Sequence, residues 1–266
     1  MLAGDLDRLH SPPCMITDPW FYCAAIPAVF LVGLSKGGFG GTMALVGVPM
    51  MALVISPVAA AGILLPILIL MDLIALYAWR GTFSKTVLAD MLPASVLGIS
   101  LGYLTSAYAP PDAVSIVVGL LSLWFVTNWF LHARHAMTPV PENRRRAWAW
   151  GVGAGYGSFV AHAGGPTFQI YVLPLRLAPP VYAGTAVVFF AVTNVAKLIP
   201  YYALGQFSYE NLATSLALFP VAPIATFCGV WLVKRLEPEL FYRIVYGLLV
   251  PVGLKLIYDG LTAISA

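Results

Sequence analysis

Long, almost unbroken apolar stretches recur along nearly the whole chain. Each is close to the roughly 20 residues that an α-helix needs to cross about 30 Å of hydrocarbon. The stretches cover residues 57–79, 86–108, 112–131, 181–203, 209–233 and 240–261. The pattern therefore predicts an all-α polytopic membrane protein.

Two further apolar regions are each interrupted by a glycine-rich tract. In the first, residues 20–34 and 42–55 flank Ser35-Lys36-Gly37-Gly38-Phe39-Gly40-Gly41. In the second, residues 147–160 and 167–177 flank Ala161-His162-Ala163-Gly164-Gly165-Pro166. Each piece is short for a full span, and paired short segments at corresponding places in two halves indicate a transporter binding site. We expect the pieces to form either re-entrant hairpins or paired short spans.

The two halves of the chain carry an ordered series of matching positions. The sequence separation between Gly62 and Asp72 in the first half equals that between Gly184 and Asn194 in the second. The further matches are Gly81-Thr82-Phe83-Ser84 with Gly205-Gln206-Phe207-Ser208, Pro93 with Pro220, Gly102 with Gly229, and Pro111-Asp112 with Pro238-Glu239. The series predicts two repeats of about five helical segments, in each of which the first two segments are short and joined by the glycine-rich break.

Lysines and arginines are concentrated in a few turns, and their positions predict the topology. Cytoplasmic loops of membrane proteins carry an excess of Lys and Arg, which assigns the linker with Arg144–Arg146 and the turns 80–85 and 234–243 to the cytoplasm. The loops near 109–112 and 204–208 contain no Lys or Arg. Counting the crossings between the basic turns makes the two repeats inverted, with both termini outside.

This topology divides the chain into four parts. Residues 1–19 are expected to form a polar N-terminal tail, because they lack the basic and apolar regions of a signal peptide. Residues 20–131 form the first membrane repeat, residues 132–146 a basic cytoplasmic linker, and residues 147–262 the second membrane repeat.

Composition excludes several classes of protein. Of the 266 residues, 60% are hydrophobic and 9% are charged, whereas an average soluble domain carries roughly 25% charged residues. A soluble enzyme, a secreted disulfide scaffold and a nucleic-acid binder are therefore excluded. Cys14, Cys23 and Cys228 are scattered and show no metal-ligand spacing, so we expect no structural disulfide and no metal site. We also expect no cofactor.

The first glycine-rich tract contains Lys36, which the pattern places within the membrane. We expect a helix to follow the tract, with Thr42 as its N-cap. The free N–H groups and the positive dipole end of that helix would then lie within the membrane, where they favour binding of an anion. The candidate ligands here are Ser35, Lys36, Gly37, Gly38, Gly40, Gly41 and Thr42. The alternative is that Lys36 extends to the membrane interface and the glycines only pack helices. Anion binding is favoured, because a broken helix at membrane depth is tolerated only beside protein or a cavity.

The second tract has the same layout with a histidine in place of the lysine. Its Gly-Gly-Pro-Thr run is typical of a loop that leads into a helix, with proline near the first turn. The candidate ligands here are His162, Gly164, Gly165, Thr167 and Gln169. An imidazole has the chemistry to donate to an anion or to carry a proton, although a lone histidine is more often a structural residue.

Three polar side chains, Asp72, Asn194 and Lys197, lie inside long apolar segments. An ionised group at the bilayer centre is costly, so such residues face a cavity or form pairs. Asn194 occupies the repeat position of Asp72, and Lys197 shares a helix face with Thr193 and Asn194, which predicts two facing half-sites. Asp72 is expected either to carry a coupling proton, as His162 would, or to hold Lys36 or Lys197 in an ion pair.

The aromatic residues have two interpretations. Tyr156, Phe159, Phe168 and Tyr171 suit an aromatic wall for an organic anion, but membrane-interface belts are the commoner use. The tryptophans near segment ends are predicted to be interface anchors: Trp20, Trp79, Trp148, Trp150 and Trp231. No GxSxG, HExxH, Walker or paired-cysteine motif occurs, so we expect a protein that is not an enzyme, with an intramembrane enzyme as the weaker alternative.

The Ser-Lys-Gly-Gly-Phe-Gly-Gly tract at 35–41, the Gly-Gly-Pro tract at 164–166 and the duplicated unit together resemble the sulfite exporter TauE/SafE family, also called the 4-toluene sulfonate uptake permease family. The resemblance covers residues 20–262. The order Gly-Leu-Ser-Lys-Gly-Gly-Phe-Gly at 33–40 is typical of the family, whereas His162-Ala163 departs from its pattern. The resemblance implies movement of sulfur-containing anions, such as sulfite, sulfonates, thiosulfate or sulfoacetate-like acids, across a bacterial-type plasma membrane, in either direction.

The residues and the resemblance together predict a multi-pass transporter that moves a small-molecule anion by alternating access. We expect the transporter to lie in the lipid bilayer and to have no nucleic-acid partner. A proton is the expected coupling ion. An anion channel, a proton-coupled carboxylate permease and a metal-cation permease stay as alternatives. The two lysines within the membrane disfavour the cation permease. The sequence leaves open the identity of the anion and the oligomeric state.

Overall fold

The structure, a computed structural model, is described over residues 16, 18–41, 47–51, 53–55, 57–105, 116, 120, 123–124, 127, 139–160, 164–205 and 207–265. These residues fold mainly into helices, and no strand occurs among them. The helices are α1 (Pro19–Lys36), α2 (Gly47–Met51), α3 (Pro57–Ala78), α4 (Lys85–Thr105), α6 (Arg144–Val160), α7 (Gly164–Val172), η3 (Leu173–Leu175), α8 (Pro179–Ala203), α9 (Tyr209–Leu218), α10 (Val221–Arg235) and α11 (Pro238–Ser265).

Four of the described helices are long and apolar enough to cross a membrane, namely α1, α3, α4 and α8. A fifth crossing arises if α9 and α10 are taken together, although they meet at an angle of 51°. Large apolar side chains also face outward, such as Ile199 on α8, which is 79% exposed. An outward apolar surface of this kind suits lipid, and the helices confirm the prediction of an all-α polytopic membrane protein.

The structure corrects several predicted boundaries. The segment predicted over 209–233 is divided at Pro220, because proline has no N–H and disfavours helical backbone in the residue before it. Helix α1 has 18 residues and includes Ser35 and Lys36, so it is long enough to span and the first break begins only at Gly37. Helix α7 already begins at Gly164.

The last residues of the predicted basic linker are helical. Helix α6 begins at Arg144, so the Arg144–Arg146 run forms its first turn and is not part of a loop. The segment predicted over 112–131 lies almost entirely outside the described residues. Residues 42–46, the start of the piece that follows the first break, and residues 161–163 of the second break also lie outside them.

Local sequence signals start two of the helices. Asp18 is the N-cap of α1, where its carboxylate accepts a hydrogen bond of 2.9 Å from the backbone N–H of Trp20, and Pro19 occupies the first turn. Ser208 caps α9 by accepting a hydrogen bond of 3.1 Å from the backbone N–H of Asn211. These caps fix where α1 and α9 begin.

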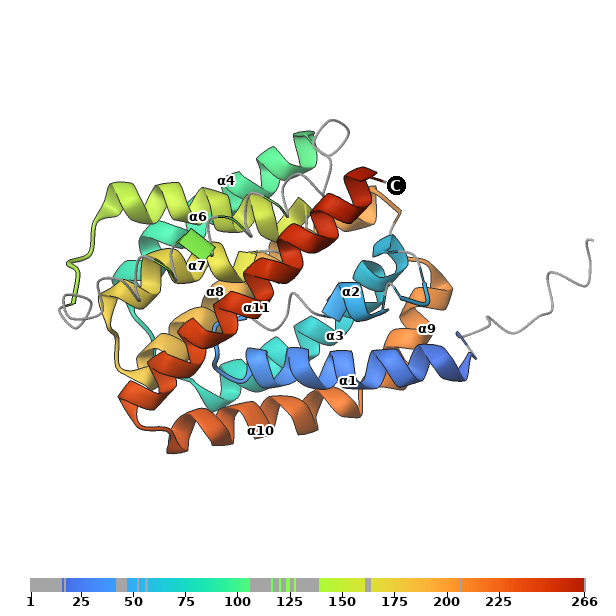
Figure 1. The fold of residues 1–266 in the computed structure, drawn as a ribbon, viewed down its shortest axis with the longest axis horizontal. Coiled ribbons are helices and arrows are strands. Elements are labelled where there is room, and N and C mark those ends of the chain that lie inside the picture. The colour runs from blue at the N-terminus through green and yellow to red at the C-terminus, as the bar shows by residue number, and fades with distance from the viewer. Residues whose placement is uncertain are drawn as a thin grey trace, which may run out of the picture.

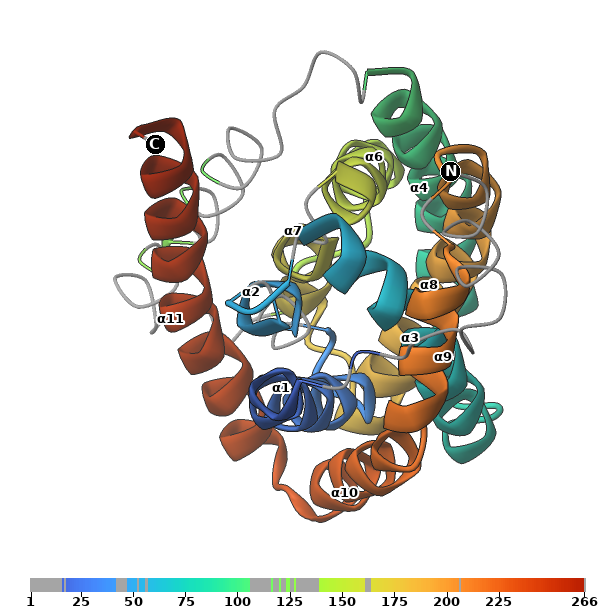
Figure 2. The same cartoon turned by 90° about the vertical axis from the view of Figure 1, so that its right-hand side faces the viewer.

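Four of the described helices form two outer pairs around the central helices α3 and α8 (Figure 1). Helix α1 packs on α10 along one edge of the molecule, and α4 packs on α6 along the other. Between them, α3 and α8 contact each other, α3 also contacts α10, and α8 also contacts α4. The short helices α2 and α7 lie in the interior (Figure 2), in contact with α1 and α6 respectively. The candidate site lies within this central region.

Glycines allow the outer helix pairs to approach closely. A Cβ atom at Gly155 of α6 would collide with the backbone carbonyl oxygen of Ser95 on α4, and one at Gly229 of α10 would collide with that of Leu34 on α1. Small residues at such contacts are the usual basis of helix packing in membranes. Both outer pairs therefore depend on glycine at their contact points.

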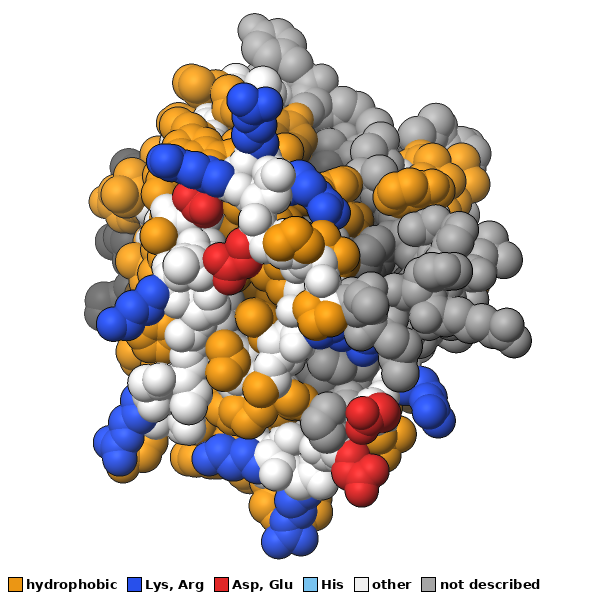
Figure 3. All heavy atoms as spheres, turned by 90° about the vertical axis from the view of Figure 1, so that its left-hand side faces the viewer, with side chains coloured by type: hydrophobic (Ala, Val, Ile, Leu, Met, Phe, Trp, Pro, Cys, Tyr) orange, Lys and Arg blue, Asp and Glu red, His pale blue; other side chains and the backbone are white. Residues whose placement is uncertain are grey.

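The basic residues gather at one end of the molecule, the left-hand end of Figure 1, which Figure 3 shows face-on. The three turns that the sequence assigns to one side of the membrane lie at this end. The exposed basic residues of these turns and of the first turn of α6 are Arg80, Lys85, Arg144, Arg145, Arg146, Lys234, Arg235 and Arg243. Helix α1 begins, and α11 ends, toward the opposite end. That the basic end faces the cytoplasm stays a prediction.

Candidate functional site

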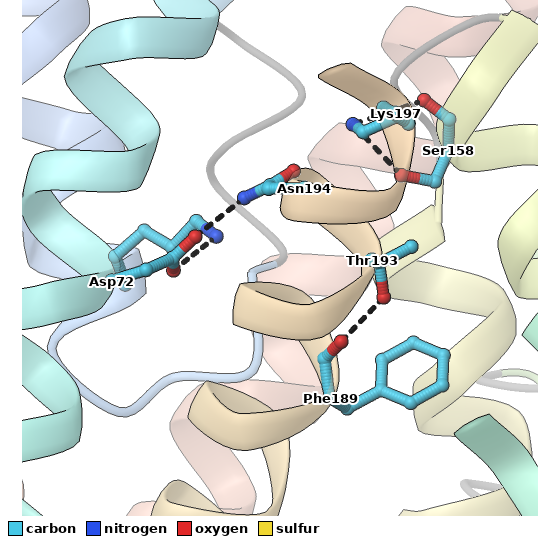
Figure 4. Close-up of polar contacts among 7 residues, drawn as sticks. Asp72, Ser158, Phe189, Thr193, Asn194 and Lys197 are labelled. Atoms are coloured by element: carbon cyan, nitrogen blue, oxygen red, sulfur yellow. Dashed lines mark hydrogen bonds and ion pairs between the residues drawn. The ribbon is translucent and has the colours of Figure 1, made fainter. Parts of the chain in front are cut away.

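A cluster of buried polar side chains lies where α1, α3, α6 and α8 meet. Its members are Lys36, Asp72, Ser158, Asn194 and Lys197, and none of their side chains is more than 5% exposed. Figure 4 shows Asn194 and Lys197 on α8, with Asp72 reaching Asn194 from α3 and Ser158 reaching Lys197 from α6. Residues that are distant in sequence are thus brought together by the contact of the two central helices with their neighbours.

Asp72 is the centre of one half of the cluster. Its Oδ1 atom lies 2.7 Å from Nζ of Lys36 in a buried ion pair, and its Oδ2 atom accepts a hydrogen bond of 2.6 Å from Nδ2 of Asn194. A buried carboxylate is tolerated when it is paired and its oxygens are hydrogen-bonded. Asp72 meets both conditions, and its two partners come from opposite halves of the chain.

Lys197 occupies the other half of the cluster and has a different partner. Its Nζ atom donates to the hydroxyl of Ser158 at 3.1 Å and lies 3.5 Å from the Ser158 carbonyl oxygen. Among the described residues, no carboxylate lies within salt-bridge distance of Lys197. With both lysines protonated, the cluster holds two ammonium groups and one carboxylate, so positive charge is in excess.

A cavity of about 40 Å³ lies beside this cluster. The described residues that line it are Val32, Lys36, Gly41, Val48, Leu64, Leu68, Ser158, Gly164, Gly165, Phe190, Asn194 and Lys197. One water needs roughly 10–15 Å³ by the same measure, so the cavity has room for about three groups of that size. It combines the amino groups of two lysines with an otherwise mostly apolar wall.

The first turn of α7 lines the cavity at Gly164 and Gly165. The first backbone N–H groups of a helix have no partner within the helix, and the dipole makes this end positive. Thr167, in the same helix, is buried, and its hydroxyl has no hydrogen-bond partner among the described residues. The end of α7 therefore adds to the positive character of the cavity.

The first glycine-rich break is a tight turn that side chains from other helices hold in place. Gly40 and Gly41 have φ values of 71° and 74°, a conformation that glycine adopts without steric cost. The indole of Trp79 donates a hydrogen bond of 2.8 Å to the Gly37 carbonyl oxygen. The amide of Gln169, on α7, donates to the Phe39 and Gly40 carbonyl oxygens at 3.1 and 3.3 Å. Gln169 therefore joins the two breaks to each other.

The predicted ligands fall into three groups. Those that line the cavity are Lys36, Gly41, Gly164, Gly165, Asn194 and Lys197. Those that lie in the adjoining helix ends and turn, but are not among the lining residues, are Ser35, Gly37, Gly38, Gly40, Thr167 and Gln169. Thr42 and His162 lie outside the described residues.

Asp72, predicted either to carry a proton or to pair with a lysine, pairs with Lys36. The polar face predicted on α8 is only partly available, because the hydroxyl of Thr193 donates to the carbonyl oxygen of Phe189 one turn earlier (Figure 4).

The structure corrects the roles predicted for some aromatic residues. Trp79 is 3% exposed and hydrogen-bonded to the first break, so it is not an interface anchor. Phe159, Phe168 and Tyr171 are buried in the apolar core and are not among the residues that line the cavity. They form neither an aromatic wall for a ligand nor an interface belt.

Two residues of the site, Ser158 and Phe190, are missing from the sequence prediction. Ser158 lies near the end of the glycine-rich helix α6, where a small hydroxyl gives no signal beyond helix packing. Phe190 lies in a long apolar segment, where an aromatic residue is ordinary. Among the described residues, no three His, Cys, Asp or Glu side chains are grouped so that they would hold a metal ion.

Comparison with known protein families places the chain in one of them. The model of the sulfite exporter TauE/SafE family matches residues 25–256, which include both breaks and all five members of the polar cluster. No curated protein and no solved structure matches the chain.

Proposed function

Because the chain belongs to the sulfite exporter TauE/SafE family, a family of membrane transporters, we propose that it moves a small sulfur oxyanion such as sulfite across the membrane. The binding site is the cavity between Lys36, Lys197 and the first turn of α7. The observation that carries the proposal is Lys197, a buried lysine that lines the cavity and whose one hydrogen-bonding partner among the described residues is Ser158. An anion would supply the missing negative charge.

The chemistry of the cavity suits an oxyanion. Charged hydrogen bonds between an ammonium group and an oxyanion are roughly twice as strong as neutral ones, and the N-terminus of a helix adds backbone donors that favour negative charge. The one carboxylate of the cluster, Asp72, is already occupied by Lys36 and Asn194. A cation permease would need free acidic ligands, so the contacts support an anion and not a cation.

The size of the cavity favours a small anion over an aromatic sulfonate. Sulfite is small, with one sulfur atom and its oxygens. Its size is therefore comparable to that of the cavity of about 40 Å³. An apolar cavity that binds benzene measures about 150 Å³. Among the substrates that the sequence resemblance implies, sulfite therefore fits the observed cavity better than an aryl sulfonate does.

Alternating access would follow from movement of one predicted repeat against the other, as in transporters built from inverted repeats. The packing of the outer helices supports such a movement, because each outer pair combines one helix from each half of the chain: α1 packs on α10, and α4 packs on α6. The hydrogen bond between Asp72 and Asn194 joins the two central helices at positions that match in the repeat. It would break and re-form as the repeats move.

Asp72 is also the proposed coupling group, with His162 as the second candidate. If Lys36 turns from Asp72 toward a bound anion, the carboxylate loses its ion pair, and uptake of a proton would then remove a buried unpaired charge. Anion and proton would move together. The basic end of the molecule would face the cytoplasm of a bacterial-type cell, with both termini outside.

Sulfite uptake into proteoliposomes tests the proposed function. We expect uptake to saturate with sulfite concentration, to depend on an imposed pH gradient, and to be inhibited by small oxyanions and not by small cations. Uptake that rises linearly and ignores the pH gradient would indicate a channel. No uptake in either direction, from protein that is shown to be folded, would overturn the proposed substrate.

A further inference from the structure

We propose that the phenyl ring of Phe190 sets the upper size limit of the anion, so that this one side chain selects sulfite and excludes organic sulfonates. The inference rests on the proposed function and concerns the same cavity. Phe190 lines the cavity from α8, one turn before Asn194. Its side chain is 7% exposed, so the ring is part of the wall and not a surface group.

The ring lies next to Lys36 and next to the turn of the first break. Nζ of Lys36 lies 5.4 Å from the ring centroid, in a cation–π arrangement. A Cβ atom placed on Gly41 would lie 3.2 Å from Cε2 of Phe190, so the ring rests directly against the turn of the first break. An anion held by Lys36 would therefore have the face or edge of this ring next to it.

The neighbours of Phe190 hold its ring in place. Its centroid lies 5.3 Å from that of Phe168 and 5.1 Å from that of Phe189, the latter with the rings at 87° to each other. Close-packed interiors do not yield to a larger ligand without repacking of several side chains. The limit on ligand size is therefore firm, and an organic substituent on the sulfur would meet this wall.

Removal of the ring should change the selectivity in a defined way. Phe190→Ala takes a phenyl group out of the wall, and benzenesulfonate carries a phenyl group of the same shape next to its anionic head. The variant is therefore expected to accept benzenesulfonate with the sulfonate at the lysines and the ring in the vacated space. Loss of the cation–π contact should weaken sulfite binding only about two- to fivefold.

Phe189→Ala is the matched control. Phe189 is the adjacent residue of the same helix, is fully buried and packs on Phe168 with centroids 4.8 Å apart, but it is not among the residues that line the cavity. Figure 4 shows its ring on the side of α8 away from Asp72. It loses the same atoms from the same core and one neighbour of Phe190, while the Phe190 ring itself stays in the cavity wall, so it reports the effect of a loosened core without removal of the wall.

The experiment measures binding of sulfite and benzenesulfonate by calorimetry to the purified full-length protein, wild type and variants. We expect wild type to bind sulfite and not benzenesulfonate, Phe190→Ala to gain at least about tenfold in benzenesulfonate affinity, and Phe189→Ala to gain nothing. Phe190→Leu, which keeps an apolar side chain in the core, is the second variant. This variant should gain affinity for the smaller methanesulfonate, and it tests the inference if Phe190→Ala does not fold.

Three results would overturn the inference. Equal gains by Phe189→Ala and Phe190→Ala would mean that a loosened core, and not the cavity wall, admits the larger anion. Sulfite binding by wild type without any gain in the folded Phe190 variants would mean that another group sets the limit. If the wild-type protein binds no anion, the proposed function itself is wrong, and the inference fails with it. In the other two cases wild type still binds sulfite, so the two kinds of failure are distinguishable.

Discussion

Lys36 and Lys197 are equally buried lysines on one cavity, yet their surroundings differ. Lys36 is paired with the Asp72 carboxylate at 2.7 Å and lies over the Phe190 ring. Within the part of the chain that the structure describes, Lys197 hydrogen-bonds only to the Ser158 hydroxyl and carbonyl oxygen. A buried ammonium group without a carboxylate is costly. We therefore propose two roles: Lys36 is held by a carboxylate of the protein itself, and Lys197 binds the negative charge of the ligand.

The largest expected effect concerns the ion pair of Lys36. Asp72→Ala would leave the Lys36 ammonium buried and unpaired, which typically lowers the free energy of unfolding by about 3–5 kcal/mol. The matched control is Asp90→Ala, because Asp90 pairs with Arg144 at 3.2 Å while their side chains are 28% and 78% exposed. Exposed pairs contribute roughly 0–1 kcal/mol. Thermal unfolding in detergent should separate the two variants.

The double variant Lys36→Met with Asp72→Leu sharpens this result. It removes both charges, so we expect it to be more stable than either single variant, with a coupling energy of about 2–3 kcal/mol. Additive losses in this double-mutant cycle would show that the two residues do not stabilise each other, contrary to the geometry.

The next largest effect separates the two lysines by function. Lys197→Met should weaken sulfite binding about tenfold to a hundredfold, since hydrogen bonds to charged groups contribute about 1.5–3 kcal/mol. It should not lower stability, because it removes a buried charge that has no carboxylate. Lys36→Met should lower both binding and stability, because it leaves Asp72 unpaired. Calorimetry and thermal unfolding on the same samples give both quantities, and a stability loss in Lys197→Met matching that of Lys36→Met would refute the assignment.

The smallest effect concerns the partner of Lys197. Ser158→Ala removes the hydroxyl that accepts from Nζ at 3.1 Å and leaves the backbone carbonyl in place. We expect sulfite to bind about two- to tenfold more weakly, in line with the net 0.5–1.5 kcal/mol of one hydrogen bond. Ser95→Ala is a suitable control, because the Ser95 hydroxyl is bonded within α4 to the Leu92 carbonyl oxygen. If Ser158→Ala and Ser95→Ala bind sulfite as wild type does, Ser158 does not position Lys197.

The polar residues of the site were predictable from the sequence, but most of their partners were not. Asp72, Asn194 and Lys197 stand out because charged and amide groups are rare in apolar segments, and glycine runs mark the breaks. The sequence left open whether Asp72 pairs with Lys36 or Lys197, because that choice depends on how α1, α3 and α8 pack. Only the structure shows that Lys36 takes the carboxylate.

Residues of ordinary type in apolar segments escaped prediction for a different reason. Phe190, Ser158 and Trp79 look like any membrane-helix residue in the sequence, and their roles arise from what each touches in three dimensions. Trp79 directly follows helix α3, and tryptophan at the end of a membrane helix usually marks the membrane interface. Here its indole turns inward to the Gly37 carbonyl oxygen, and the rule fails because a buried acceptor lies within reach.

The most direct test of the central claim locates the anion itself. Crystals of the wild-type protein soaked in selenite, the selenium analogue of sulfite, would reveal the ligand by anomalous scattering. We predict a selenium peak inside the cavity, with a selenite oxygen about 2.7–2.9 Å from Nζ of Lys197 and the first turn of α7 beside it. A peak found only among the exposed arginines and lysines of the basic end, with none at Lys197, would contradict the account.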